Sequence, residues 1–169
     1  LSGETAAGKY PVESVEIMDK IILQSEAHLK TYGHWKGTES ESIGDDATSI
    51  TRAAREMAHD LNVAAIVVFT QSGRTAGIMS KALPRVPILG FTPEIRGYHK
   101  MAFYWGVYPY MIPYADTIEE MLRHVDTAMI ASTPIKPGQQ VVVISGFPVG
   151  VRGISLRNTI CFGTIKRAI

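Results

Sequence analysis

The residues best suited to chemistry form a short polar segment, Thr70-Gln71-Ser72-Gly73-Arg74-Thr75, between an apolar run and a helical pattern. Hydroxyl groups, a glycine and an arginine at the start of a helix favour an anion, because unpaired N–H groups and the positive end of the helix dipole meet there. An ordinary glycine turn with a serine or threonine cap explains these residues equally well. The segment is therefore a candidate phosphate-binding loop, with a plain turn as the alternative.

A second candidate loop covers residues 145–157. Considered alone, it is better explained as a flexible hairpin loop without a ligand. In an open parallel sheet, however, ligands bind beyond the carboxyl ends of strands, where the strand order reverses. If the two loops follow neighbouring strands at that point, we expect a phosphorylated small molecule to bridge them, with Arg74 or Arg152 supplying the cation. The second loop contains Gly146, Pro148, Gly150, Arg152 and Gly153, of which the glycines offer backbone donors and Arg152 a cation.

Other functional patterns are weaker. Neither the histidines nor the single cysteine, Cys161, has metal-ligand spacing, so we expect no metal site. No Ser, His and Asp arrangement and no P-loop is present. An aromatic cluster near residue 105 could stack on a ligand, but packing between a helix and a strand is the stronger interpretation. The histidines are His28, His34, His59, His99 and His124, and the aromatic residues are Phe103, Tyr104, Trp105, Tyr108 and Tyr110.

The bulk composition is that of a globular protein. Of the 169 residues, 46% are hydrophobic and 20% charged, and the formal net charge is +1. This near balance argues against nucleic-acid and membrane-surface partners. The longest apolar run, residues 63–69, is far shorter than the roughly 20 residues that span a bilayer. One cysteine and no signal peptide indicate a soluble protein of the cytoplasm. Because the sequence begins with Leu1, we interpret it as a piece of a longer protein.

Hydrophobic periodicity divides the chain into a helix, a linker and an α/β region. A helix beginning at Tyr10-Pro11 is predicted to about residue 30, and residues 31–45 are interpreted as a linker. Strands and helices then alternate, which predicts a mostly parallel sheet covered on both faces, a three-layer α/β/α sandwich. Five strands are predicted, at residues 63–69, 86–91, 107–112, 140–145 and 158–165, and four helices, at about residues 46–61, 75–83, 93–104 and 117–129.

The last strand is expected to run antiparallel to the strand before it. A parallel return needs a crossover of a dozen or more residues, which is usually helical. Only the glycine-rich segment 146–157 separates the two strands, and it shows no helical period. The predicted sheet is therefore mixed.

Several motifs resemble the pyruvate kinase family. The opening run Leu1-Ser2-Gly3-Glu4-Thr5-Ala6, followed by residues 8–13, resembles the signature with which the catalytic TIM barrel of that family ends. The rest follows in family order and covers nearly the whole chain. Its matching segments are residues 66–70, Ser72-Gly73-Arg74-Thr75, Pro87-Ile88-Leu89, Trp105-Gly106-Val107 and residues 138–146.

This resemblance implies a domain plan and a set of site residues. Residues 1–30 would be the last strand end and helix of the barrel, 31–45 a linker, and 46–169 a C-terminal effector-binding domain. In that family such a domain binds a phosphorylated effector, often fructose 1,6-bisphosphate, and contributes to tetramer contacts. Ser2, Glu4 and Thr5 would belong to the barrel-end wall of the active site. By the same resemblance, Thr70, Gln71, Ser72, Gly73, Arg74 and Thr75 hold an effector phosphate, with Gly146, Pro148, Gly150 and Gly153 in the effector loop.

The family enzyme transfers a phosphoryl group from phosphoenolpyruvate to ADP, giving pyruvate and ATP in glycolysis, with magnesium and commonly potassium. The catalytic lysine, the acidic magnesium ligands, the potassium site and the lid domain of the family have no counterpart in this sequence. Phosphoryl transfer depends on positioned metal ions and cations. The chain by itself is therefore expected to need no cofactor and to be inactive.

One departure from the family pattern keeps alternatives open. The usual Gly-Thr-Thr-Asn run after the effector loop is replaced by Gly153-Ile154-Ser155-Leu156-Arg157-Asn158. The leading interpretation is the regulatory portion of a pyruvate kinase, but a free-standing sensor of phosphorylated metabolites is a second one. A third is an oligomerisation scaffold whose ligand loop has decayed.

Overall fold

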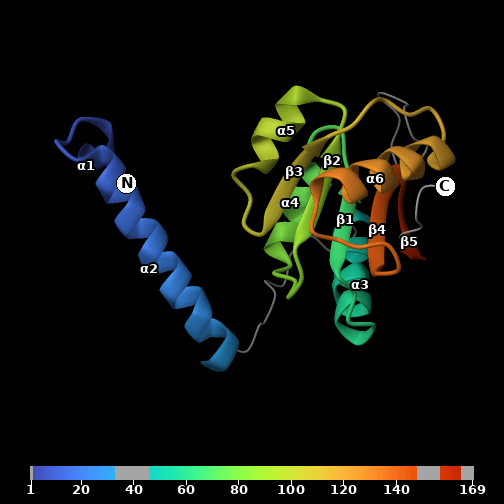
Figure 1. Ribbon diagram of the computed structural model, residues 1–169, viewed down its shortest axis with the longest axis horizontal. Coiled ribbons are helices and arrows are strands. Elements are labelled where there is room, and N and C mark those ends of the chain that lie inside the picture. The colour runs from blue at the N-terminus through green and yellow to red at the C-terminus, as the bar shows by residue number, and fades with distance from the viewer. Residues whose placement is uncertain (1, 33–45, 148–156, 165–169) are drawn as a thin grey trace. The chain divides into compact units, whose positions relative to one another are not determined.

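The computed structural model describes residues 2–32, 46–147 and 157–164, drawn in colour in Figure 1. The chain divides into two compact units, residues 1–36 and 37–169. The boundary expected in the 31–45 linker falls mostly outside the described residues, although Thr31 and Tyr32 still belong to a helix.

The first unit consists of a single helical turn, α1 (Gly3–Ala6), and a long helix, α2 (Pro11–Tyr32). Pro11 occupies the first helical position, where its missing N–H costs nothing. Between the helices, a Cβ on Gly8 would lie 2.4 Å from the carbonyl oxygen of Glu4, so the tight turn requires glycine. The expected strand end is replaced here by a helical turn: the N–H of Ala6 bonds to the carbonyl of Ser2 at 3.0 Å, whereas a strand would need a neighbouring strand.

The second unit is built on one sheet with the strand order β3-β2-β1-β4-β5. The strands are β1 (Ala65–Phe69), β2 (Ile88–Thr92), β3 (Val107–Met111), β4 (Gln140–Phe147) and β5 (Arg157–Thr164). The first four are mutually parallel, and β5 pairs antiparallel with β4 through Val143 opposite Cys161. The prediction of a mixed five-stranded sheet with a reversed last strand is confirmed.

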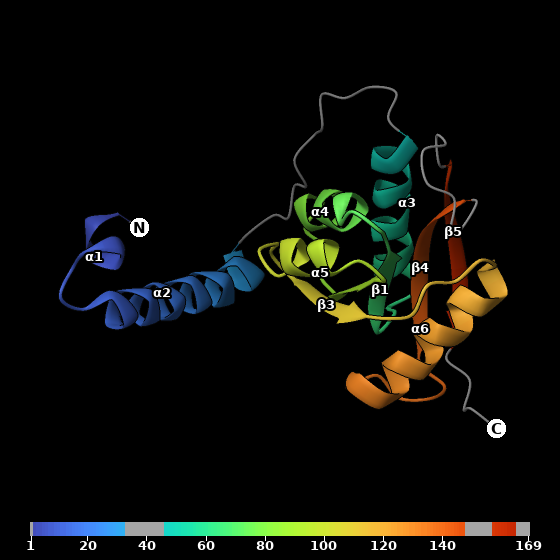
Figure 2. The same ribbon diagram turned by 90° about the horizontal axis from the view of Figure 1, so that it is seen from above.

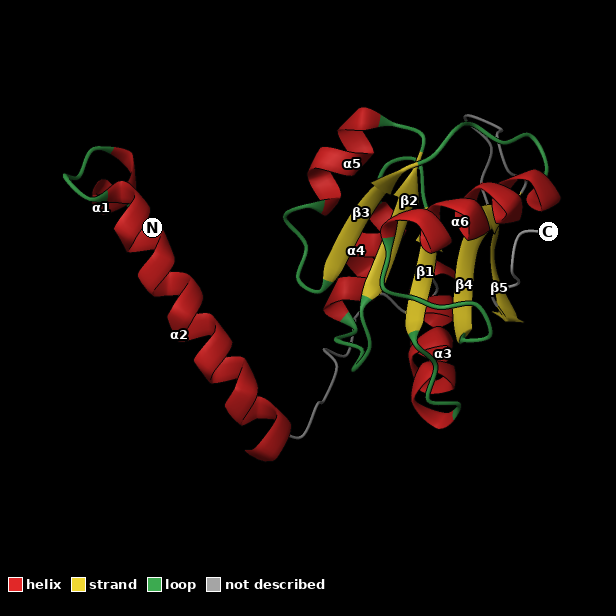
Figure 3. Cartoon of the chain, viewed as in Figure 1, coloured by secondary structure: helices red, strands yellow, loops and turns green. Residues whose placement is uncertain are grey.

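Helices cover both faces of this sheet, as Figure 2 and Figure 3 show. On one side lie α3 (Asp46–Asp60), α4 (Arg74–Lys81) and α5 (Ile95–Met101), and on the other lies α6 (Ile118–Ser132). Alternate strand residues point to opposite faces. Ile66 and Val68 therefore pack with Ala54, Met79 and other residues of α3, α4 and α5, while the opposite face of the sheet packs on α6. That second core contains Ala65, Val67, Phe69, Met121, Val125 and Met129.

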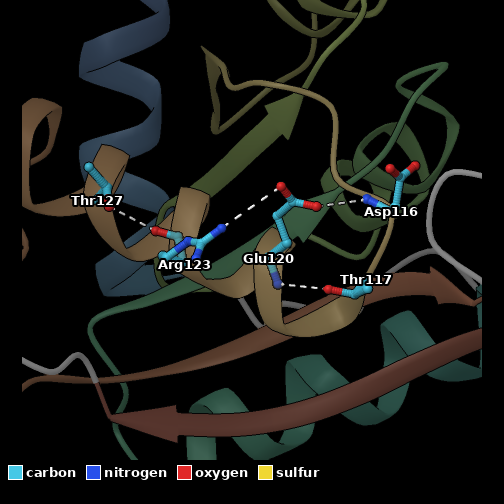
Figure 4. Close-up of polar contacts among 5 residues, drawn as sticks. All are labelled: Asp116, Thr117, Glu120, Arg123 and Thr127. Carbon is cyan, nitrogen blue, oxygen red and sulfur yellow. Dashed lines mark hydrogen bonds and ion pairs between the residues drawn. The ribbon is translucent and has the colours of Figure 1, made fainter.

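Helix ends follow the local chemistry of the sequence. Thr117 caps α6 by accepting a hydrogen bond from the N–H of Glu120 at 3.2 Å (Figure 4). In return, the Glu120 carboxylate accepts a hydrogen bond from the N–H of Asp116, the residue before the cap. The helices α4 and α5 are shorter than predicted. Leu83 takes a left-handed conformation (φ 51°) after α4, and Glu94, in extended conformation, precedes α5.

The strand β3 forms one edge of the sheet and carries a proline. Gly106 accepts a bond from Ile88, and Ile112 donates one to Thr92, so the even-numbered residues of this segment face β2. Pro109, an odd-numbered residue, therefore stands where an N–H would point outward from the sheet. A proline at such a position blunts the edge against pairing with another strand.

Candidate functional site

The reversal of strand order lies between β1 and β4. The chain leaves β1 toward β2 and β3 on one side, then returns to place β4 on the other side of β1 (Figure 1). In the register of this parallel pair, Val68 lies opposite Ile144. The segment after Phe69 therefore leaves the sheet beside Ser145, while β4 continues to Phe147 in its pairing with β5. This meets the topological condition on which the predicted two-loop site depended.

The first loop connects β1 to α4. Thr70 is buried, and its N–H donates to the carbonyl of Phe91 at 3.0 Å. Gly73 takes a left-handed conformation (φ 76°) at the N-cap of α4, which a residue with a side chain rarely adopts. The first intrahelical bond joins the N–H of Gly77 to the carbonyl of Gly73, so the N–H groups of Thr75 and Ala76 precede it. This is the backbone arrangement that suits an anion.

Side chains of the loop complete this arrangement. Ser72 and Arg74 are exposed, and the Ser72 hydroxyl accepts a long bond of 3.4 Å from the N–H of Arg74. Thr75 is half-buried in the first turn of α4. The loop thus offers a hydroxyl, a guanidinium and backbone donors along one short segment, as the sequence predicts.

Two residues that the sequence analysis did not single out, Thr92 and Gly97, contact the backbone of this loop. The Thr92 hydroxyl, at the end of β2, donates to the carbonyl of Gln71 at 3.2 Å and accepts from the N–H of Glu94 at 3.1 Å. A Cβ on Gly97, in α5, would lie 2.4 Å from the same Gln71 oxygen. The only sequence signal for Thr92 is its place directly after a buried strand, on the edge where ligands bind.

The second loop begins at the end of β4. Ser145 is buried and Gly146 half-buried, and the β4–β5 hairpin continues to the pair Phe147 and Arg157. The prediction that the loop begins at Ser145 is therefore wrong: Ser145 and Gly146 belong to β4, beside the first loop, and Arg157 begins β5. The other predicted residues of this loop lie outside the described residues: Pro148, Gly150, Arg152 and Gly153.

The predicted barrel-end residues lie in the first unit, in and before α1. The Glu4 carboxylate accepts hydrogen bonds from the N–H of Ser2 at 3.2 Å and from its hydroxyl at 2.9 Å, and Thr5 donates to the carbonyl of Ser2 at 3.1 Å. Bonds from the Glu4 backbone and the Ser2 hydroxyl lower the pKa of this exposed carboxyl. A single carboxylate already bonded at both oxygens does not fit a magnesium site, which needs several oxygen ligands.

In the described part of the chain, His, Cys, Asp and Glu side chains form no group of three or more that could hold a metal ion. Among the helices of that part, none combines the length and apolarity that crossing a bilayer requires.

The aromatic cluster splits between core and surface. Tyr110 stacks on Phe91 with ring centroids 5.2 Å apart. Tyr104 packs against Gly77 and against the core between the sheet and helices α3, α4 and α5. Phe103 is 90% exposed and Tyr108 56%. The predicted packing role therefore holds for Tyr104 and Tyr110 and is wrong for Phe103 and Tyr108. An exposed turn carries Phe103, and Tyr108 lies on the edge strand.

Comparisons with known proteins agree on one family. Residues 48–160 match the family described as "Pyruvate kinase, alpha/beta domain". A pyruvate kinase of Geobacillus stearothermophilus is 38% identical over 153 residues, covering 90% of this chain and 26% of the relative. Similar proteins with the same name occur in Agrobacterium vitis (35% identical, 32% of the relative) and Mycobacterium tuberculosis (32% identical, 32% of the relative). The chain thus spans about a third or less of these relatives.

Proposed function

The chain belongs to the pyruvate kinase family and contains its C-terminal α/β domain, and from this premise we propose that it is the regulatory portion of such an enzyme. In this proposal the second unit binds a phosphorylated effector between the two loops at the carboxyl edge of the sheet. The observation that carries it is the adjacency of β1 and β4 where the strand order reverses, with residues 70–75 opening a helix there.

The charge and hydrogen-bond donors of the loop support a phosphate as the group bound. Backbone N–H groups of the first turn of α4 and the Ser72 hydroxyl would surround the phosphate oxygens, and Arg74 would add a charge-assisted bond. A ligand with two phosphates could reach from this loop to the one after β4. Fructose 1,6-bisphosphate has this chemistry.

The activity of the parent enzyme is part of the same proposal. The relatives carry the name pyruvate kinase, so the complete protein would transfer a phosphoryl group from phosphoenolpyruvate to ADP in the cytoplasm, with magnesium and potassium. The remainder of that chain would be the partner of the first unit, and the whole would assemble as a homotetramer. Exposed apolar side chains along α2, among them Val15 (51% exposed) and Ile17 (57% exposed), support a missing partner surface.

The chain alone should not catalyse this transfer. The one acidic site residue it supplies, Glu4, does not form a magnesium site, so no step can be assigned to it. A coupled assay of the pure chain with phosphoenolpyruvate, ADP, magnesium and potassium should show no turnover. Turnover proportional to the concentration of the chain would contradict this.

The effector site is tested by calorimetric titration of fructose 1,6-bisphosphate into the 169-residue chain. We expect Ser72→Glu to abolish binding, because it places a negative charge where the phosphate would sit. Thr127→Glu, at an exposed position of α6, is the matched control and should bind as the unmodified chain does. Equal binding by all three proteins would place the site elsewhere. Absence of binding by the unmodified chain would favour a scaffold with a decayed loop.

A further inference from the structure

Thr92 is a completely buried polar residue with both of its hydrogen-bonding capacities in use. It is 0% exposed and ends β2. Its hydroxyl hydrogen goes to the Gln71 carbonyl at 3.2 Å, and its oxygen accepts the Glu94 N–H at 3.1 Å. One side chain therefore ties the β1–α4 loop to the segment that starts α5, across 21 residues of sequence.

The bond to Gln71 controls the direction of a donor in the loop. A trans peptide is planar, with its C=O and N–H pointing in opposite directions. Because Thr92 holds the Gln71 carbonyl on the side of α5, the N–H of the same peptide, which belongs to Ser72, must point away from α5. The bond from the Thr70 N–H to the Phe91 carbonyl anchors the residue before this peptide in the same way.

Packing from α5 limits where the Gln71 carbonyl can lie. Gly97 leaves room that any Cβ would fill, because a Cβ there would be 2.4 Å from the Gln71 oxygen and 3.0 Å from the Thr92 hydroxyl. The carbonyl, the hydroxyl and the helix backbone are thus in close contact. Rotation of the Gln71–Ser72 peptide would break the bond to Thr92.

We propose that Thr92 is a positioning residue for anion binding: its hydroxyl holds the Gln71 carbonyl and thereby aims the Ser72 N–H at the phosphate. This inference rests on the proposed function of the loop as an anion site. Loss of the buried Thr92 hydroxyl, which touches no ligand, should therefore weaken the binding of phosphate by the loop.

Two substitutions at this position separate the hydroxyl from the shape of the side chain. Thr92→Val keeps the branched shape and removes both hydrogen bonds, whereas Thr92→Ser keeps the hydroxyl and removes the methyl group. Fructose 1,6-bisphosphate and inorganic phosphate are titrated into the full chain and both variants, and the Ser72 amide is followed by NMR. A purely structural role would make affinity follow the melting temperature in both variants. His99→Ala, at an exposed position of α5, serves as a control for that helix.

We expect Thr92→Val to bind about tenfold or more weakly, with a shifted Ser72 amide resonance. Thr92→Ser should retain affinity within about twofold even if its melting temperature falls, because its hydroxyl can make the same bonds. If Thr92→Val fails to fold by circular dichroism, Gly97→Ala replaces it. The Gly97→Ala variant displaces the Gln71 carbonyl but keeps the Thr92 hydroxyl, and we expect the same tenfold or greater loss of affinity.

Three results would overturn the inference. Unchanged affinity of Thr92→Val, or of Gly97→Ala in its place, would show that the bond does not position the site, while leaving the site itself intact. Equal loss in the Val and Ser variants would assign the effect to packing of the methyl group. Absence of binding by the unmodified chain would overturn the anion site, and this inference with it.

Discussion

The hydroxyl of Ser80 donates a 2.7 Å hydrogen bond to the backbone carbonyl of Trp105. Ser80 lies in the penultimate position of α4 and is only 7% exposed, while Trp105 precedes the edge strand β3. The bond therefore joins two segments 25 residues apart on the same face of the sheet. It satisfies a carbonyl outside any strand or helix.

Replacing Ser80 by alanine should destabilise the second unit. The substitution leaves the Trp105 carbonyl without this donor, and a part-buried hydrogen bond of this kind contributes about 0.5–1.5 kcal/mol. Urea unfolding followed by tryptophan fluorescence measures the change. Ser132→Ala, at an exposed position at the end of α6, is the control and should lie within about 0.5 kcal/mol of the unmodified chain. Equal midpoints for Ser80→Ala and the control would contradict a role for this bond.

The cap of α6 predicts a second effect on stability. Thr117 satisfies the N–H of Glu120, and replacing such a cap by alanine costs about 1 kcal/mol. Thr127→Ala in the same helix removes a hydroxyl that bonds to the carbonyl of Arg123 and caps no helix end (Figure 4). Because alanine has the higher helix propensity, this control should be neutral or slightly stabilising. Denaturant titration of both variants tests the contrast, and a neutral Thr117→Ala would refute the cap.

The folding stability of the chain should depend on the charge of His59. Burial, with the nearby positive charges of Arg55 and Arg85, lowers the pKa of His59 below its ordinary value of 6.5. Its Nε2 accepts the N–H of Arg85 at 3.3 Å, which only the neutral ring can do. As pH falls below 6.5, the unfolded state takes up this proton first, so stability contributed by His59 is complete above that pH and is lost toward the folded pKa.

Two measurements check the histidine prediction. NMR titration should give a midpoint for His59 below 6.5. His59→Gln, whose amide oxygen accepts a bond at any pH, should gain stability relative to the unmodified chain as pH falls through this window. A difference between the two proteins that does not change with pH would count against it.

The exposed apolar side of α2 predicts weak protection of that helix. Isolated helices are marginal in water, and most helix stability comes from packing of an apolar face. Val12 and Leu23 are 66% and 58% exposed, whereas every residue of β1 is buried. Hydrogen exchange should therefore be faster throughout residues 12–27 than in β1. Equal protection would show that α2 has found a partner surface, for example in a second copy of the chain.

Much of the second unit was predictable from local patterns. The alternation of apolar runs and helical periods predicted the elements, and the short connection after β4 predicted the antiparallel β5, because chain length limits which returns are possible. The cap at Thr117 also follows a local pattern, since the N–H that it accepts from belongs to Glu120, three residues away. A phosphate-binding role could be proposed for residues 70–75 because a helix start carries its own hydrogen-bond donors.

What the tertiary structure alone decided involves residues far apart in sequence. Periodicity shows that β1 and β4 are strands, but only the packed sheet makes them neighbours, because any order of parallel strands can bury the same apolar residues. The same holds for Thr92 and Gln71: a threonine after a strand has no local signal for its partner, and the bond exists because β2 and α5 bring the hydroxyl against the loop. Sequence determined which groups could bind an anion, and folding decided which of them are held in place, since a hydrogen bond requires both partners at about 3 Å.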